Sequence, residues 1–110
     1  MKLQHQSLAS GRWQKMPFVE QMANIGSEIE RTINWKNKNK KDYSQKAFER
    51  GLELLDLTIQ TLKNKKRLKE LTRLREALID YFQFNNQFKS SDQLWQKYFY
   101  AFNFAARRNF

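Results

Sequence analysis

The sequence has no cysteine, one proline, three glycines and one histidine. Without cysteine there is no disulfide, thiolate zinc site, iron–sulfur cluster or cysteine nucleophile. The single histidine, His5, excludes sites that need a histidine pair and catalytic relays of the Ser–His type. So few turn-forming residues argue against a β-sandwich or β-barrel, because both folds need many turns. The composition therefore favours helices and gives no support to an enzyme.

Long apolar runs are also missing. No stretch approaches the roughly 18 consecutive apolar residues of a transmembrane helix, and residues 1–12 lack the apolar segment of a signal peptide. We therefore expect a cytoplasmic protein without membrane contacts. The length of 110 residues suits one domain. We place a flexible leader, which includes His5, at residues 1–15 and the domain at residues 16–110.

Four segments carry apolar residues at steps of three and four, which is the period of an amphipathic helix. They predict helices over Pro17–Trp35, Asp42–Leu62, Lys65–Phe82 and Ser91–Arg108. The fourth helix places Leu94, Trp95, Tyr98, Phe99 and Phe102 on its apolar face. Short polar loops join the four segments. The sequence thus predicts an all-α fold, an antiparallel up-down-up-down four-helix bundle.

Local signals mark several helix starts. Asp42 with Gln45 three residues later has the spacing of a capping box. Asn64 and one of Ser90 or Ser91 are candidate N-caps for the third and fourth helices. These signals support the predicted boundaries.

A few residues do not fit the apolar stripes. Gly51 lies beside the stripe of the second helix, where it favours close helix packing. Arg75 falls on the apolar side of the third helix, so it needs a carboxylate or must reach the edge of the core. Glu30 is its expected partner in an ion pair that fixes helix register, and a functional site on this pair is the alternative. Leu57 and Trp35 point away from their stripes, which favours an oligomer.

Glu49, Glu53 and Asp56 lie on one outward side of the second helix. Three carboxylates at this spacing can in principle hold a divalent metal. No histidine joins them and no second carboxylate helix is evident, so a solvated acidic face or a partner for a basic stripe is the favoured interpretation. We predict no metal, no cofactor and no catalytic residue.

Lysine and arginine outnumber aspartate and glutamate by 21 to 11, which gives a net charge of +10. The segments 36–46 and 63–75 together account for this excess, and we expect them at opposite ends of the second helix. A monomer would then need the stripe of Lys66, Lys69 and Arg73 to connect them, or an oligomer to gather several copies. We favour a basic groove formed by assembly, while a purely solubilising charge is the alternative.

The fourth helix carries aromatic residues away from its core side. Tyr100 and Phe104 are four residues apart, with Lys97, Arg107 and Arg108 nearby. Exposed rings can stack on bases while the cations neutralise phosphates. Aromatic residues and arginine are also enriched at subunit interfaces. A subunit interface is the favoured interpretation of this surface, a nucleic-acid site is the second and incidental exposure is the third.

In size, charge and four-helix periodicity, the segment Pro17–Arg108 resembles the small basic bundles of the ribosomal RNA intervening-sequence proteins. It is also similar to the accessory bundle proteins of diversity-generating retroelements. The stretches QMANIGSEIER (Gln21–Arg31) and LELLDLTI (Leu52–Ile59) look like segments of small uncharacterised prokaryotic proteins. The bundle resemblance implies oligomerisation and nucleic-acid binding beside a larger enzyme, and it carries over no functional residue.

We therefore expect a non-enzymatic accessory protein that binds RNA or DNA through phosphate contacts, as a homo-oligomer or with a larger protein partner. The alternative is an adaptor or assembly subunit that does not bind nucleic acid. The candidate nucleic-acid-binding residues are Lys36, Lys38, Lys40, Lys41, Lys63, Lys65, Lys66, Lys69, Arg73, Lys97, Tyr100, Phe104, Arg107 and Arg108.

Overall fold

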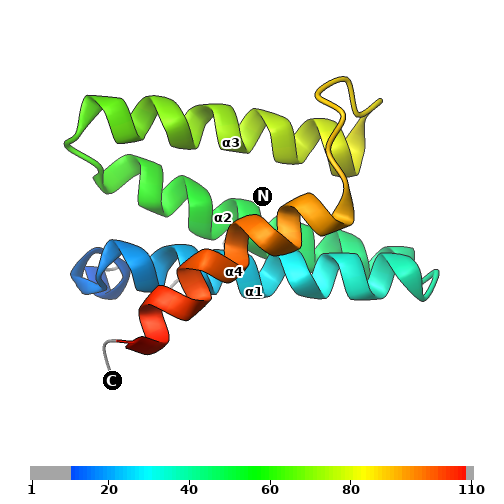
Figure 1. Cartoon of the computed structure of the whole chain (residues 1–110), viewed down its shortest axis with the longest axis horizontal. Coiled ribbons are helices and arrows are strands. Elements are labelled where there is room, and N and C mark those ends of the chain that lie inside the picture. The colour runs from blue at the N-terminus through cyan, green and yellow to red at the C-terminus, as the bar shows by residue number, and fades with distance from the viewer. Residues whose placement is uncertain (1–10, 109–110) are drawn as a thin grey trace.

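All four predicted helices are present in the computed structural model, which describes residues 11–108 (Figure 1). They are α1 (Phe18–Asn37), α2 (Lys41–Thr61), α3 (Lys65–Gln83) and α4 (Asp92–Arg108), and a 3₁₀ turn, η2 (Trp13–Lys15), precedes them. This part of the chain has no β-strand. The all-α class is confirmed, and every boundary lies within two residues of its predicted position.

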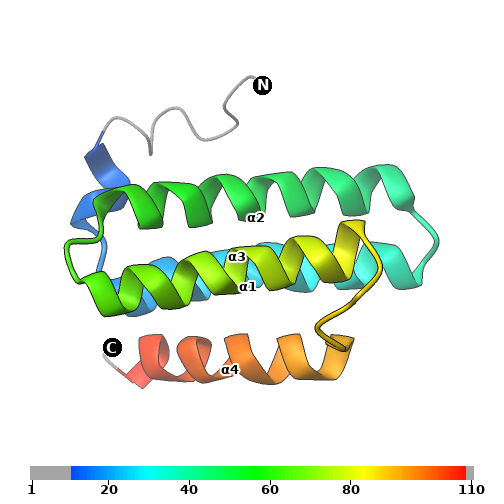
Figure 2. The same cartoon turned by 90° about the horizontal axis from the view of Figure 1, so that it is seen from above.

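The helices pack side by side as a bundle. α1 contacts both α2 and α4, and α2 contacts α3. Figure 1 shows α4 crossing α1 at an angle, and Figure 2 shows the four helices from above as rods lying alongside one another. The link before α2 and the link after it lie at opposite ends of the bundle, as expected for the two basic segments.

The apolar stripes of all four helices meet in one core. Each stripe contributes residues from successive turns, which is why their spacing predicted the helices. The buried apolar side chains include Met22, Ile25, Ile29, Ile33, Phe48, Leu55, Leu71, Leu74, Leu78, Trp95 and Phe99.

Two glycines allow neighbouring helices to approach closely. A Cβ at Gly51 would lie 3.3 Å from Ile29 Cδ1, so the close packing predicted for Gly51 is confirmed. Gly26, which the apolar pattern did not single out, is the tighter contact. A Cβ there would lie 2.7 Å from Phe99 Cβ, so only glycine lets α4 approach α1 this closely.

Side-chain caps form at two of the predicted helix starts. Asn64 Oδ1 accepts a hydrogen bond from the Arg67 amide at 3.1 Å, and Ser91 Oγ accepts one from the Leu94 amide at 3.2 Å. The predicted capping box of α2 is wrong. This helix begins one residue before Asp42, its N-cap position is Lys40, and no side chain caps it.

The predicted leader is too long. Residues 13–15 form η2, and Trp13 is buried against the core with its indole Nε1 donating to Thr58 Oγ1 at 2.8 Å. Gln21 Nε2 also donates to the Trp13 carbonyl at 2.7 Å. Residues 1–10, with His5, lie outside the described residues, as do residues 109–110.

The predicted faces of three helices also need correction. Leu57, expected on the outside of α2, is buried within this one chain. Trp35 is half-buried and its ring packs on Tyr43 at a centroid distance of 4.8 Å. Leu94 and Tyr98 of α4, expected in the core, are exposed instead. Leu57 and Trp35 therefore no longer argue for an oligomer, because the monomer itself covers them.

Candidate nucleic-acid interface

The predicted cationic stripe lies on the outward face of α3. Lys66, Lys69 and Arg73 are all exposed, and none of them takes part in an ion pair among the described residues. Glu70 and Glu76 are exposed on the same helix. The positive charge is therefore densest at the start of α3 and weakens along its length.

The start of α3 lies at the same end of the bundle as three other cation-bearing segments. Figures 1 and 2 show that these are η2, the α2–α3 link and the end of α4. The start of α1 lies at this end as well. The Arg67 guanidinium lies over the Phe18 ring at 4.1 Å, and Phe18 contacts Phe102 of α4 at 6.3 Å. We name this region the basic end; its cations are Arg12, Lys15, Lys63, Lys65, Lys66, Arg67, Arg107 and Arg108.

The two basic segments beside α2 lie far apart, as expected. The basic end adds cations from η2 and from the last turn of α4, which lie at the same end of the bundle as the α2–α3 link. Figure 1 shows the link and the end of α4 on opposite sides of α1, so these cations are spread over the end of the bundle. Arg12, Lys15 and Arg67 were missed as site residues, the first two because they were assigned to the leader. The signal available was Trp13 between them, since a tryptophan is costly to leave in water.

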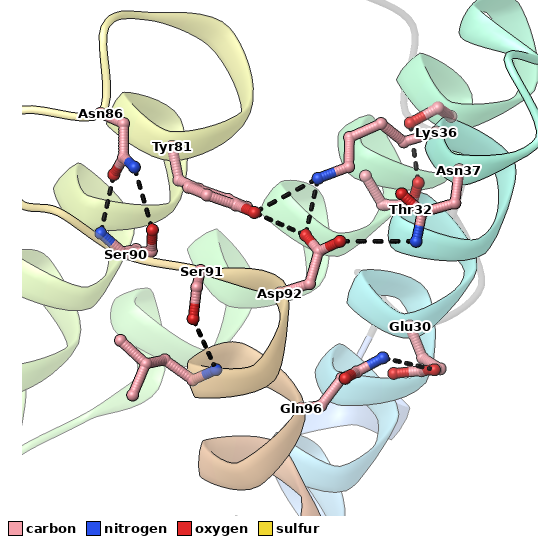
Figure 3. A network of polar contacts seen from close by, with 12 residues as sticks. Glu30, Thr32, Lys36, Asn37, Tyr81, Asn86, Ser90, Ser91, Asp92 and Gln96 are labelled. Carbon is pink, nitrogen blue, oxygen red and sulfur yellow. Dashed lines mark hydrogen bonds and ion pairs between the residues drawn. The ribbon is translucent and has the colours of Figure 1, made fainter.

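At the opposite end, Lys36 is already neutralised by the chain's own carboxylate. Its Nζ lies 2.6 Å from Asp92 Oδ1 and donates to Tyr81 Oη at 3.3 Å (Figure 3). The Tyr81 hydroxyl also donates to Asp92 Oδ1 at 2.6 Å, and Asn37 Nδ2 reaches the other carboxylate oxygen. Lys36 therefore ties α1 to α3 and α4, and its charge is already paired although its side chain is 40% exposed.

The network shifts the pKa values of its three ionisable groups. Burial alone would lower the pKa of Lys36, but the hydrogen bonds with Asp92 and Tyr81 outweigh it and raise this pKa. Burial alone would raise the pKa of Asp92, but its hydrogen bonds from Lys36 and Tyr81 hold this pKa below its usual value. Burial and the bond to Asp92 raise the pKa of Tyr81. All three shifts favour the charged pair with a neutral tyrosine.

The remaining lysines of this end stay accessible. Lys38, Lys40 and Lys41 are exposed, and the Lys38 ammonium lies 5.5 Å from the centre of the Trp35 ring. None of the three forms an ion pair among residues 11–108. Asp42 follows Lys41 in the sequence, and Asp92 lies at the same end of the bundle, where it bonds to Lys36 and Asn37. This end is therefore less strongly positive than the basic end.

The outward face of α4 carries the predicted aromatic residues. Tyr100 is 65% exposed and Phe104 is 53% exposed. Their rings lie nearly parallel, 6.4 Å apart, and the Arg108 guanidinium lies 6.0 Å from the Phe104 ring. Lys97 and Arg107 are exposed on the same helix. The prediction that these rings face solvent beside cations is confirmed.

A shallow groove runs between this face and α1. Gly26, Trp95, Gln96, Tyr100 and Asn103 line part of it, in a hollow of about 290 Å³. Glu30 borders the groove and accepts a hydrogen bond from Gln96 at 3.3 Å. Glu30 therefore does not pair with Arg75 as predicted.

Arg75 pairs instead with Asp56 of α2. Its Nε lies 2.7 Å from Asp56 Oδ1, and both side chains are more than a third exposed. Arg75 thus reaches the edge of the core as expected. Glu53, predicted on the outside with Asp56, is buried, and no group of residues that could hold a metal ion is found in the described part of the chain.

Comparisons with family models, with curated proteins and with solved structures found no match to this chain. Among the described residues, no helix is both long enough and apolar enough to cross a membrane.

Proposed function

We propose that this protein is a non-enzymatic accessory protein that binds nucleic acid, RNA or DNA, through contacts with phosphates. The observation that carries the proposal is the basic end, where cations from four segments of the chain lie at one end of the bundle. Glu20, in the first turn of α1, is the acidic residue that lies with them. Such a surface attracts a polyanion and steers its approach.

The pattern of ion pairs supports this assignment. Among residues 11–108, the cations held in ion pairs are Arg31, Lys36, Arg50 and Arg75, and all of them lie outside the basic end. A cation that already pairs with a carboxylate gains little from a phosphate, whereas an unpaired one releases the counterions of the nucleic acid when it binds. Lys63, Lys65 and Lys66 are thus better placed to bind phosphate than Lys36.

We also propose the antiparallel up-down-up-down order of the bundle. Three residues separate α1 from α2 and three separate α2 from α3, while each helix is about 30 Å long. A link this short cannot return along a neighbouring helix, so helices packed side by side must alternate in direction. This order is what brings the ends of α2 and α4 to the start of α1.

The proposal is tested by titrating nucleic acid against the protein while the salt concentration is varied. The variant Lys63→Gln/Lys65→Gln/Lys66→Gln should bind more weakly than the wild type. Its slope of log affinity against log salt should fall by about 2 to 3, since each phosphate contact contributes roughly 0.7 to 0.9. Fluorescence anisotropy with a labelled 20-nucleotide strand measures both quantities.

The matched control is Lys38→Gln/Lys40→Gln/Lys41→Gln. It removes the same charge from the opposite end of the bundle, so it should change the affinity and the slope less. Wild-type binding that does not depend on salt, or no binding at all, would contradict the proposal. An equal effect of the two variants would show that long-range charge acts and that the basic end is no specific site.

A second candidate function is docking on another protein or on a second copy, and the loop between α3 and α4 favours it. Phe84 and Phe88 of this loop are 72% and 62% exposed. Large apolar side chains with more than half of their surface exposed to water are typical of protein interfaces. Native mass measurement of the wild type and of Phe84→Ser/Phe88→Ser tests this candidate. If the loop forms the interface, the wild type forms a complex and the variant does not.

Under either function we propose a cytoplasmic setting.

A further inference from the structure

We propose that the outward face of α4 binds an unpaired strand, with one base inserted between the rings of Tyr100 and Phe104. The inference rests on the proposed function and narrows its ligand from nucleic acid in general to single-stranded segments. It begins with the spacing of the rings. Their centroids are 6.4 Å apart and their planes differ by 28°. A base stacked between both rings needs two stacking distances, about 6.8 Å at the 3.4 Å rise of stacked bases. The spacing between the two ring planes cannot exceed the distance between their centroids, so the rings must move apart to admit a base.

The two rings can move apart to accept a base. Both are more than half exposed, so solvent surrounds most of each ring and leaves room for this movement. They lie four residues apart on a helix that is held against α1 by the close approach at Gly26. The helix backbone fixes the positions at which the two rings are attached, which lowers the entropy cost of binding a base.

The charges beside the rings match the backbone of a nucleic acid. Lys97, Tyr100, Phe104 and Arg108 follow one another at steps of three, four and four, so they form one stripe along α4. The sequence of α4 has no acidic residue after Asp92. Glu30 of α1 is the carboxylate that borders the neighbouring groove, where Gln96 holds it. Phosphates on either side of the inserted base therefore meet Lys97 and Arg108.

Two other occupants of this face are disfavoured, a second copy by charge and a duplex by its base pairing. A second copy packed α4 against α4 would bring the lysines and arginines of both faces together, and like charges that face each other are destabilising. A duplex offers phosphates, but its bases are already paired and stacked, so a base must leave the stack before it can enter the ring pair. An unpaired strand offers phosphates to the cations and free bases to the rings, without the cost of removing a base from a stack.

The experiment compares four ligands with the wild type and with Tyr100→Leu/Phe104→Leu. The ligands are a 20-nucleotide thymidine strand, its uridine counterpart, a 20-base-pair duplex and a 20-unit abasic strand that keeps the phosphates. Each stacked base contributes a factor of about five to a hundred in affinity. We expect the variant to lose at least tenfold for the two strands with bases and less than threefold for the duplex and the abasic strand.

Phe88→Leu is the control, because it removes an exposed aromatic ring from the loop at the other end of α4. It should bind all four ligands like the wild type, and circular dichroism should show the same helix content for all three proteins. If the variant binds every ligand as tightly as the wild type does, the ring site is overturned while phosphate binding stands. An equal loss for the normal and abasic strands also overturns it. If the wild type binds none of the ligands, the proposed function fails as well.

Discussion

Asp92 connects three helices through one carboxylate. It lies in the first turn of α4 and accepts hydrogen bonds from Lys36 of α1 and Tyr81 of α3 (Figure 3). A carboxylate at this position also interacts favourably with the positive end of the α4 dipole. Because α4 follows a loop rather than a tight turn, this side chain helps to fix where the helix begins.

We predict that Asp92→Asn lowers the free energy of unfolding by about 1 to 2 kcal/mol. Hydrogen bonds to charged groups contribute roughly 1.5 to 3 kcal/mol each, and we reduce this value because the Lys36 side chain is 40% exposed and screened by solvent. Urea denaturation at neutral pH measures the difference. Asp42→Asn is the control. It removes an exposed carboxylate that forms no ion pair among the described residues, and it should cost less than about 0.5 kcal/mol.

The contribution of Asp92 should depend on pH. Its pKa is lower in the folded chain than its usual value, mainly because the hydrogen bonds from Lys36 and Tyr81 overcome the opposing effect of burial. The unfolded chain then takes up this proton first, so the stabilisation is complete above about pH 4 and is lost as the pH falls further. The gap between wild type and Asp92→Asn should be constant above about pH 4 and should narrow as the pH is lowered below that value in the same denaturation experiment. A gap that is constant over this range would contradict the role of the charge.

Gly26 should tolerate substitution less well than Gly51. A Cβ at Gly26 would lie 2.7 Å from Phe99 Cβ, which no side-chain rotation can relieve, so Gly26→Ala must push α4 away from α1. We predict a loss of about 1 to 3 kcal/mol. In Gly51→Ala the new Cβ meets the flexible end of Ile29 at 3.3 Å, and the gain in helix propensity offsets part of the strain. Thermal unfolding followed by circular dichroism ranks the two variants, and equal losses would contradict the prediction.

At the scale of elements, the loop between α3 and α4 is more ordered than its polar sequence indicates. The Asp80 carboxylate accepts hydrogen bonds from the amides of Gln87 and Phe88 at 2.9 and 3.0 Å. The Asn86 side chain bonds to both the amide and the carbonyl of Ser90. Asn86 has a φ of 53°, a left-handed conformation that asparagine adopts more easily than most residues. These bonds hold Phe84 and Phe88 in place although both face solvent.

We predict that Asp80→Ala exposes this loop to proteolysis. Removal of the carboxylate leaves the two loop amides without their acceptor, so the loop should open more often. Chymotrypsin, which cleaves after aromatic residues, should then cut after Phe84 or Phe88 several times faster than in the wild type. Mass spectrometry of the first fragments identifies the site. Glu76→Ala, on the same helix one turn earlier, is the control, and equal rates for the two variants would contradict the prediction.

The helices were predictable because their signals are local. Steps of three and four between residues such as Met22, Ile25 and Ile29 depend only on neighbours along the chain, and the caps at Asn64 and Ser91 act within one turn. The apolar pattern gave the wrong burial for residues at the edges of the buried helix faces. Leu57 and Leu94 each lie about where a helix passes from its buried to its exposed side, and the packing partner decides which side they take.

The long-range partners were not predictable from the sequence. Arg75 had several carboxylates within reach of its helix, and only the packing of α3 on α2 selects Asp56 over Glu30. Lys36 and Asp92 are 56 residues apart, so no spacing links them. The exposure of Tyr100 and Phe104 was predictable because both lie opposite the core side of α4. The basic end was not, since it depends on which helix ends the fold brings together.

At the scale of the whole molecule, charge is distributed unevenly over a small body. The net charge is +10, and the described chain measures 36 × 29 × 28 Å. The ion pairs found within it lie along the helices and at the Lys36 end, while the basic end depends on solvent ions to reduce its repulsion. Folding therefore brings like charges together, and this opposes the hydrophobic core.

We predict that the fold becomes more stable as salt is added. Charges repel over about 30 Å at 0.01 M salt, which is the width of the whole molecule, but over only about 8 Å at 0.15 M. Each kcal/mol of repulsion that is screened raises Tm by roughly 4 to 8 °C in a domain of this size. Calorimetry of the wild type in sodium chloride should show a rise of several degrees. Lys63→Gln/Lys65→Gln/Lys66→Gln should start from a higher Tm and respond less, because part of the repulsion is already gone. If the surface ion pairs dominated instead, salt would weaken them and Tm would fall.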